Sequence, residues 1–319
     1  MPDSVAKTEQ RRAVHRLKLK HAKKKNNHAL AALVVIIGLI VMVYPVVATQ
    51  WNNWKQQRAA VEYAKIDNST PQIVHDEAWD AAHKYNEERA QGPIFDPWVN
   101  HFVPDNYAYQ EYLSILNGQD AMGRIILPSI KADLPIYHGS SEDVLQKGIG
   151  HLFGSDLPVG GVGSHSVLTG HTGIPTATLF DNLNRVKKGD AFFMHIAGHK
   201  IKYEVDQIKV VLPNETEDLK VEAGKDLITL VTCTPYGINT HRLLVRGHQV
   251  PIAEEEKNML DEAQGVSWQW WMYVLTAIFI AGLVCLIAWL IQQSRRAAKK
   301  HENSLIVPDS ESTENKTEL

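Results

Sequence analysis

Residues 227–247 read LITLVTCTPYGINTHRLLVRG and hold the pattern that decides the fold. An apolar, β-branched run leads to Cys233, a loop with a proline and a glycine follows, and a second short run begins at Arg242. Two strands joined by a loop are expected from this pattern. If the strands pair antiparallel, Arg242 returns to the region of Cys233, and side-chain alternation lets only one of His241 and Arg242 face the thiol.

The rest of the chain after Met122 has the same character. Short, β-branched, alternating segments are separated by Gly, Pro, Asn and Asp, which is typical of an all-β barrel or sandwich. Strands are expected at residues 123–130, 134–137, 165–169, 191–196, 199–205, 207–211, 227–232 and 242–247. Short helical pieces are expected at residues 141–147, around 178–186, and at 253–264. These expectations define a β-domain at residues 122–252 and a connecting helical segment at residues 253–267.

Two apolar runs flank this region. Residues 29–49 and 268–292 carry no charge, and each is long enough to cross a hydrocarbon core of about 30 Å as a helix. Basic residues precede the first run, in residues 1–28, and follow the second, in residues 293–319, so both termini are predicted to be cytoplasmic. The chain is therefore interpreted as a cell-membrane protein with two spans and an extracellular domain between them.

An alternative for the first run is a cleaved signal peptide. Val46 and Ala48 are small enough for a peptidase site. However, the apolar run is longer than the roughly 7–15 residues of a signal-peptide core, and its basic prelude is also long. The two-span interpretation is preferred.

Residues 50–121 are predicted to form an extracellular helical segment. Two helices are expected within residues 55–90, with a break at NSTPQ, residues 68–72, where a proline suits the first turn of the second helix. Residues 91–106, QGPIFDPWVNHFVPDN, contain three prolines and bulky aromatic residues and cannot form a regular helix. A loop is predicted there.

The composition excludes little. The chain has 319 residues, of which 44% are hydrophobic and 22% charged, as in an ordinary globular protein. The net charge of -3 combines a basic N-terminus with an acidic C-terminal tail, so it indicates no nucleic-acid partner. Residues 302–319 have too few apolar residues to fold and are predicted to be disordered. The histidines lack metal-ligand spacing, so no metal and no cofactor are expected.

The chain has two cysteines, Cys233 and Cys285. Cys285 falls within the second apolar run, where a small apolar residue in lipid is the simplest interpretation, and Cys233 is left without a disulfide partner. A thiol is a useful nucleophile as a thiolate, and from a free pKa near 8.5 it needs a neighbouring cation or imidazole. His171, in LTGHTG at residues 168–173, lies between glycines that leave its ring approachable. Considered one at a time, none of the three residues indicates catalysis. Cys233 alone is interpreted as a small buried apolar residue, His171 as a surface or hydrogen-bonded loop residue, and Arg242 as a solvated arginine at a strand end.

Taken together, these residues and their surroundings resemble the sortases, the membrane-anchored cysteine transpeptidases of Gram-positive bacteria. TLVTC at residues 229–233 is similar to the family's Thr-Leu-x-Thr-Cys signature, and Arg242 follows at the family's spacing. LPIYHGSSEDVLQKGIGHLFGSDLPVGG at residues 134–161, SVLTGHTGIPTATLF at residues 166–180 and residues 229–247 resemble the class C, or pilin-polymerising, branch, as does the second span. The resemblance implies a mainly β fold with an eight-stranded sortase-type barrel, which agrees with the number of strands expected.

The resemblance also implies the roles of individual residues. Cys233 is expected to be the nucleophile that forms an acyl-thioester with an LPxTG-like sorting signal, His171 the general acid/base, and Arg242 the positive group that steadies substrate and oxyanion. The partners implied are pilin proteins that carry such a signal and an acceptor lysine. The activity expected is transpeptidation that polymerises pilus subunits.

The proline-rich loop gains a role from the same resemblance. Asp96, Pro97 and Trp98 are similar to the Asp-Pro-aromatic lid motif of class C sortases. Asp96 is expected to pair with Arg242 or the thiol region, while the Trp98 ring covers the site and shields the thiol from oxidants. A plain proline-rich linker is the alternative for this loop.

Two other functions remain open from the sequence. One is a sortase that attaches single proteins to peptidoglycan; the lid motif and the second span favour pilin polymerisation over it. The other is a membrane-tethered β-domain that binds a surface partner without chemistry. Loss of surface assembly in a Cys233→Ala variant would separate the enzyme from the binding domain.

Overall fold

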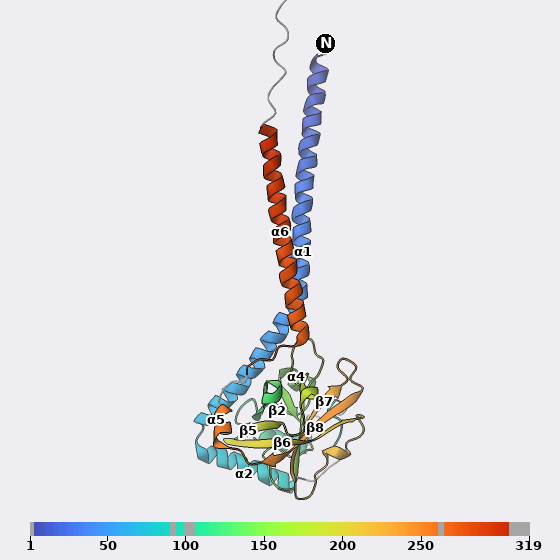
Figure 1. Ribbon diagram of the computed structural model, residues 1–319. Helices are drawn as coiled ribbons and strands as arrows, with labels where there is room; N and C mark the ends of the chain where they lie inside the picture. The colour runs from blue at the N-terminus through green and yellow to red at the C-terminus, as the bar shows by residue number, and fades with distance from the viewer. Residues whose placement is uncertain (1–2, 90–93, 99–105, 261–264, 306–319) are drawn as a thin grey trace, which may run out of the picture. The chain divides into compact units, whose positions relative to one another are not determined.

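The computed structural model describes residues 3–89, 94–98, 106–260 and 265–305, so most of the predicted lid loop at residues 91–106 lies outside the described residues. The chain divides into two compact units (Figure 1). One comprises Met1–Val46 with Gln269–Leu319, and the other is Val47–Trp268.

The first unit is built from parts of two long helices. Helix α1 (Asp3–Ser69) contains Pro45, and helix α6 spans Trp270–Leu305. By length and composition each is able to cross a membrane, with a mean hydropathy of 2.9 in the first and 2.8 in the second. Helix α6 continues into the tail predicted to be disordered, and the remainder of that tail, residues 306–319, lies outside the described residues.

The second unit contains a closed barrel of eight strands, as predicted. The strands are β1 (Gly123–Leu127), β2 (Ala132–His138), β3 (Ile149–His151), β4 (Ser164–Thr169), β5 (Ala191–Ile196), β6 (His199–Val211), β7 (Asp226–Thr234) and β8 (His241–Val250). They follow one another around the barrel in the order β1-β2-β3-β4-β7-β8-β6-β5. The β2–β3 and β4–β7 pairs are parallel and the other pairs are antiparallel.

The number of strands was predicted correctly, but two of the individual strand predictions were wrong. Strand β3 was not expected, because three residues are too short to show an alternating pattern. Strand β6 is continuous where two strands were expected, because its pairing with β8 shifts register between Val205 and Gln207. A bulge of this kind interrupts the alternation of side chains without ending the strand.

The barrel is filled by apolar side chains from successive strands. Ile125, Ile136, Met194, Leu230 and Val245 come from five different strands, and all are fully buried in one hydrophobic cluster. Burying such side chains stabilises the fold by about 1.5–3 kcal/mol each relative to exposure. The interior is therefore a packed core, and chemistry must take place at strand ends and on the outer face.

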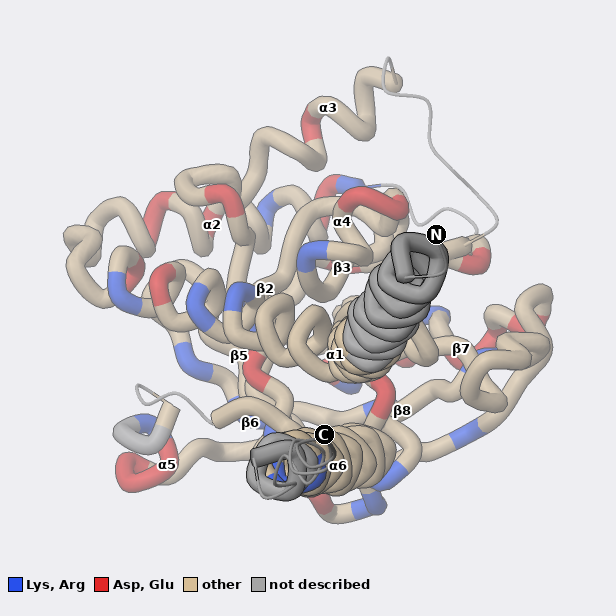
Figure 2. Tube along the Cα trace, turned by 90° about the horizontal axis from the view of Figure 1, so that it is seen from above, with Lys and Arg blue, Asp and Glu red and all other residues tan. Residues whose placement is uncertain are grey.

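Helices of the predicted extracellular segment pack on the barrel. Helix α1 ends at Ser69 and α2 (Gln72–Glu88) begins after Pro71, which is its N-cap residue, so the predicted break is present. Ala82 of α2 and Tyr112 of α3 (Tyr107–Ser114) belong to the core cluster. The remaining short helices are α4 (Glu142–Lys147), α5 (Glu254–Met259) and the 3-10 turns η1 (Pro128–Ile130), η2 (Leu183–Arg185) and η3 (Glu217–Leu219). Basic and acidic residues alternate along the chain of this unit, with no large region of one charge (Figure 2).

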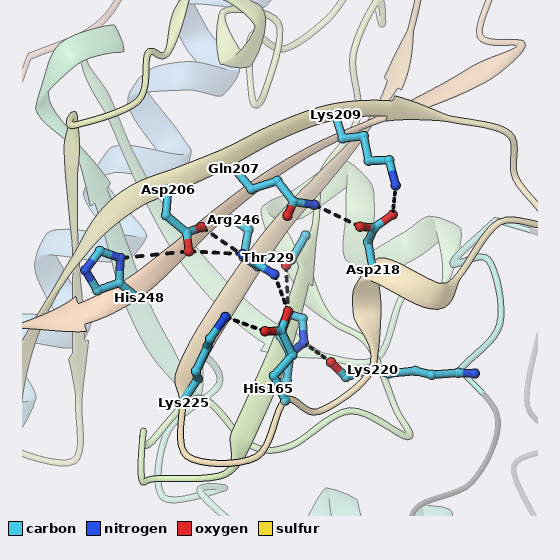
Figure 3. Close-up of polar contacts among 11 residues, drawn as sticks. His165, Asp206, Gln207, Lys209, Asp218, Lys220, Lys225, Thr229, Arg246 and His248 are labelled. Atoms are coloured by element: carbon cyan, nitrogen blue, oxygen red, sulfur yellow. Dashed lines mark hydrogen bonds and ion pairs between the residues drawn. The ribbon is translucent and has the colours of Figure 1, made fainter.

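The connection between β6 and β7, residues 212–225, is held to the barrel by a polar network (Figure 3). Arg246 of β8 makes a bidentate ion pair with Asp206, with both N–O distances 3.0 Å, and a further ion pair with Glu222 of the connection. His165 Nδ1 lies 2.7 Å from the Lys220 carbonyl oxygen, and its Nε2 lies 2.7 Å from Thr229 Oγ1. These contacts fix the connection to the barrel. Leu219 belongs to this connection and lies in the buried cluster against which Trp98 packs.

Candidate active site

Strand pairing places Cys233 and Arg242 opposite each other. Cys233 lies near the end of β7 and is directly paired with Arg242 at the start of β8, while Thr234 pairs with His241. Of the two candidate cations, Arg242 is therefore the one beside the thiol. Cys233 is a free cysteine with 7% of its surface exposed.

Three effects set the protonation of this thiol. Burial raises the pKa of Cys233 above its usual value, the Arg242 guanidinium lowers it, and the Asp96 carboxylate raises it again. The net direction is upward, so the thiol form is favoured near neutral pH while Asp96 is in place. A change that removed Asp96 would shift the balance toward the thiolate.

The lid motif, Asp96–Trp98, lies on Arg242. The Arg242 Nε donates to Asp96 Oδ2 at 2.6 Å and Nη2 donates to Oδ1 at 3.1 Å, a bidentate pair in which both side chains are buried. The Arg242 guanidinium carbon lies 4.7 Å from the centre of the Trp98 ring, within cation–π range. The backbone N–H of Trp98 donates to Asp96 Oδ1 at 3.0 Å, so the Asp96 carboxylate also holds the backbone of the residue that carries the indole.

The same tryptophan reaches His171. The two ring centres are 6.3 Å apart, and His171 Nε2 lies 3.3 Å from Glu142 Oε2 of α4. The neighbours of His171 are fixed to β7 beside Cys233: the Thr232 hydroxyl donates to the Gly170 carbonyl at 2.7 Å, and its oxygen lies 2.8 Å from the Thr172 hydroxyl, from which it can accept a hydrogen bond. The structure thus brings the predicted histidine, arginine and cysteine into one neighbourhood, with Trp98 against the first two.

An apolar patch lies under the lid. Ile94 and Trp98 pack against a buried cluster from four strands and two connections, made of Leu152, Val167, Val211, Leu219, Val231 and Leu244. Phe95, in contrast, is 44% exposed. Pro97 is buried, and its carbonyl accepts a hydrogen bond from the Ser140 hydroxyl at 3.1 Å.

The sequence did not single out several of these contact residues. Ser140 and Glu142 stand within the stretch at 134–161 that resembles class C sortases, and this resemblance is the signal that points to them, because neither has a distinctive motif of its own. Leu219 is separated from the lid by many residues and has the appearance of an ordinary apolar residue in a polar connection. No group of three or more His, Cys, Asp or Glu in the described ranges is arranged to hold a metal.

Asp181 is a further ionisable residue beside the histidine. Its Oδ1 accepts a hydrogen bond from the Gly173 N–H at 2.8 Å. Burial raises the pKa of Asp181 to about 7, and the Gly173 bond only partly offsets this rise. In the unfolded chain this carboxyl has an ordinary pKa near 4. It therefore makes the stability of the barrel depend on pH.

An Asp181→Asn variant is expected to lose this pH dependence. Because the pKa is raised on folding, protonated Asp181 contributes stability that is present in full below about pH 4 and is lost as the pH rises through about 7. Asparagine stays neutral and still accepts from Gly173. Relative to the wild type, the variant should gain up to about 3 kcal/mol between pH 5 and pH 8, measured by urea unfolding. Equal pH dependence in both proteins would contradict the raised pKa, and Asp143→Asn, at an exposed carboxylate of α4, is the matched control.

The comparisons with known proteins agree with this geometry. Residues 125–250 match the sortase domain family. The chain is similar to solved structures of sortase C-1 from Actinomyces oris (52% identity, 56% of this chain and 99% of that chain, TM-score 0.54) and of sortase C from Streptococcus pneumoniae (39% identity, 61% and 97%, TM-score 0.56). The second structure was described for its insights into catalysis and pilin substrate specificity. Sortase A of Bacillus anthracis is 31% identical over 135 residues, 42% of this chain and 62% of that protein.

These findings define the class of protein. The chain belongs to the sortase family, whose members are cysteine transpeptidases. The solved structures that it resembles over nearly their whole length include these two class C sortases and also sortase A from Corynebacterium diphtheriae (44% identity, 66% of this chain and 100% of that chain, TM-score 0.58). The chain spans less than two thirds of the length of the curated relatives it matches.

Proposed function

We propose that this protein is a membrane-anchored pilin sortase. It cleaves an LPxTG-like sorting signal between Thr and Gly and joins the threonine to the side-chain amine of a pilin lysine. The observation that carries this proposal is the placement of Asp96 and Trp98 on Arg242, opposite Cys233, in a chain 52% identical to a sortase C-1. A lid that folds over the active site is a feature that the resemblance assigns to the pilin-polymerising branch.

In the first half of the proposed reaction Cys233 is acylated. Its thiolate attacks the threonine carbonyl carbon, and the C–O π electrons move to oxygen. The positively charged Arg242 guanidinium stabilises that oxyanion. Collapse breaks the Thr–Gly C–N bond while protonated His171 gives its proton to the leaving glycine amine, and a thioester remains on Cys233.

In the second half the thioester is transferred to an amine. The neutral lysine amine attacks the thioester carbonyl, its extra proton passes to His171, and Cys233 leaves as the thiolate. An isopeptide bond forms, and the enzyme returns to its starting protonation state with no net oxidation or reduction. The Asp96–Arg242 pair has to open first, because Arg242 cannot direct the same N–H groups at Asp96 and at an oxyanion.

The proposed topology has two spans and an extracellular unit at Val47–Trp268. The apolar segments of α1 and α6, and the basic residues beyond each of them, support this orientation. Protease added to intact protoplasts is then expected to digest the unit at Val47–Trp268 and to spare an epitope tag at either terminus. Digestion of either tag would exclude the orientation.

Purified pilin subunits test the polymerising activity. The full chain, incubated in detergent with a pilin that carries the sorting signal and its lysines, is expected to produce a ladder of covalent oligomers. Replacement of the acceptor lysine by arginine should remove the ladder while the acyl-enzyme still forms. Products restricted to single subunits joined to a peptidoglycan amine would favour the alternative function, the attachment of individual proteins to the cell wall.

A further inference from the structure

The loop that carries His171 folds back on itself. We call residues 171–182, which follow β4, the His171 loop. Its start and end are joined by two hydrogen bonds: the Phe180 N–H donates to the His171 carbonyl at 3.1 Å, and the Gly173 N–H donates to Asp181 at 2.8 Å. The position of His171 therefore depends on the conformation of residues that follow it by several positions.

One face of α1 holds the middle of this loop. The Thr49 hydroxyl donates to the Pro175 carbonyl at 2.9 Å, and the Asn52 side chain donates to the Thr176 carbonyl at 2.9 Å. Asn53 makes two bonds to one residue, with Nδ2 donating to Thr178 Oγ1 at 2.7 Å and Oδ1 accepting from the Thr178 N–H at 2.9 Å. The spacing i, i+3, i+4 puts all three side chains on the same side of the helix.

The Asn53 contact is buried and adjoins an unfavourable backbone conformation. Asn53 and Thr178 are 8% and 7% exposed, so water does not compete freely for their bonds. The next residue, Leu179, has φ of +39°, in the left-handed region that leucine rarely occupies. Its conformation is held on one side by the bonds of Thr178 to Asn53 and on the other by the bond of Phe180 to His171.

The C-terminal end of the His171 loop is hydrogen-bonded to the segment that precedes α6. The Asn182 side chain donates to Ser267 Oγ at 3.1 Å, and Gln50 of α1 donates to the Ser267 carbonyl at 3.3 Å. Ser267 lies shortly before α6 begins at Trp270. All of these contacts lie inside the compact unit Val47–Trp268.

We propose that Asn53, supported by Thr49 and Asn52, is a positioning residue for His171. This inference rests on the proposed function, in which His171 moves a proton to the leaving amine. The segment that continues from the first apolar run is then part of the catalytic unit, in addition to being a tether. Because proton transfer requires hydrogen-bond reach, a shift of about 1 Å at His171 is enough to lower the rate of the chemical step by about 100-fold.

The main test is an Asn53→Ala variant of the full chain in detergent, assayed with a fluorogenic sorting-signal peptide. We expect kcat to fall about 10-fold or more and KM to change less than about twofold, since His171 acts in proton transfer. Thr178→Val, which removes only the hydroxyl partner, should have a smaller effect. Asn53→Asp should keep most of the wild-type kcat. Its carboxylate accepts a hydrogen bond from the Thr178 N–H and, after the Thr178 hydroxyl has rotated, a second hydrogen bond from that hydroxyl. Lys55→Ala, at an exposed position of the same helix, is the matched control and should match the wild type.

A second readout does not depend on activity. In Asn53→Ala, hydrogen exchange at the Gly173 and Phe180 amides should accelerate about 10-fold, while the amides of β7 keep their wild-type rates. Unchanged exchange in the loop, faster exchange with unchanged kcat, or faster exchange throughout the barrel would each overturn the inference. If the wild-type chain cleaves no sorting-signal peptide, the proposed function fails, and the exchange data alone decide whether Asn53 holds the His171 loop.

Discussion

Replacement of Cys233 by alanine is expected to abolish acyl-enzyme formation with a sorting-signal peptide, whereas replacement of Cys285 by alanine should leave it intact. Both residues are free cysteines, but Cys233 lies opposite Arg242 at the end of β7 and Cys285 lies in α6. Removing the nucleophile of a unit that acts by covalent catalysis typically lowers the rate by about 10³-fold or more. The two variants form a matched pair, since each removes one sulfur atom.

Intact mass spectrometry of the full chain provides the measurement. The wild type and Cys285→Ala should gain the mass of the peptide up to and including its threonine, and Cys233→Ala should gain none. The substitution removes little volume at a 7% exposed position, so wild-type unfolding behaviour is expected and should be verified. A thioester adduct that persists in Cys233→Ala would exclude the proposed nucleophile.

Removal of the lid contacts is expected to make the Cys233 thiol more reactive. In the double variant Asp96→Ala, Trp98→Ala, the rate of alkylation of Cys233 by a small neutral reagent should rise about 10-fold or more at pH 7. Two physical effects combine. Burial and Asp96 both raise the pKa of Cys233 and Arg242 lowers it, so removal of Asp96 lowers that pKa relative to the wild type. Without Trp98, the ring that lies on Arg242 and near His171 no longer restricts access.

The controls for this prediction come from the same segment. Phe95 is exposed, so Phe95→Ala should be alkylated at the wild-type rate. Asp96→Asn tests the electrostatic part alone, because the amide keeps the size of the side chain but not the charge. An unchanged alkylation rate in the double variant would mean that Asp96 and Trp98 do not limit access to Cys233, and the lid proposal would fall.

Local sequence was sufficient for the parts of the fold that depend on neighbouring residues. The strand–loop–strand of residues 227–247 predicted that Arg242 returns to the region of Cys233, and the strand pairing then selected Arg242 over His241 as the residue opposite the thiol. The break before α2 followed from a proline, and the two apolar helices followed from hydrophobic length. Errors arose where periodicity fails, in the three-residue β3 and at the bulge of β6.

Contacts between segments far apart in the sequence could be predicted only in part. The pairing of Asp96 with Arg242 was expected as one of two possibilities, and only the tertiary structure selected it. Glu142, Ser140 and Asp181 were not singled out, since a lone carboxylate or hydroxyl in a connection carries no pattern. The sequence also gave no indication that α1 holds the His171 loop through Asn53.

By itself, therefore, the sequence determined the kind of fold, the two apolar helices, the family resemblance and the three residues proposed to carry the chemistry. These depend on short-range pattern and on residue identity at fixed spacing. The tertiary structure decided what surrounds those residues: Asp96 paired with Arg242, a thiol whose pKa is raised, and a loop after His171 that is hydrogen-bonded to a helix remote in sequence. The physical reason is that charge, burial and hydrogen-bond partners are properties of positions in space, which barrel closure sets for residues far apart along the chain.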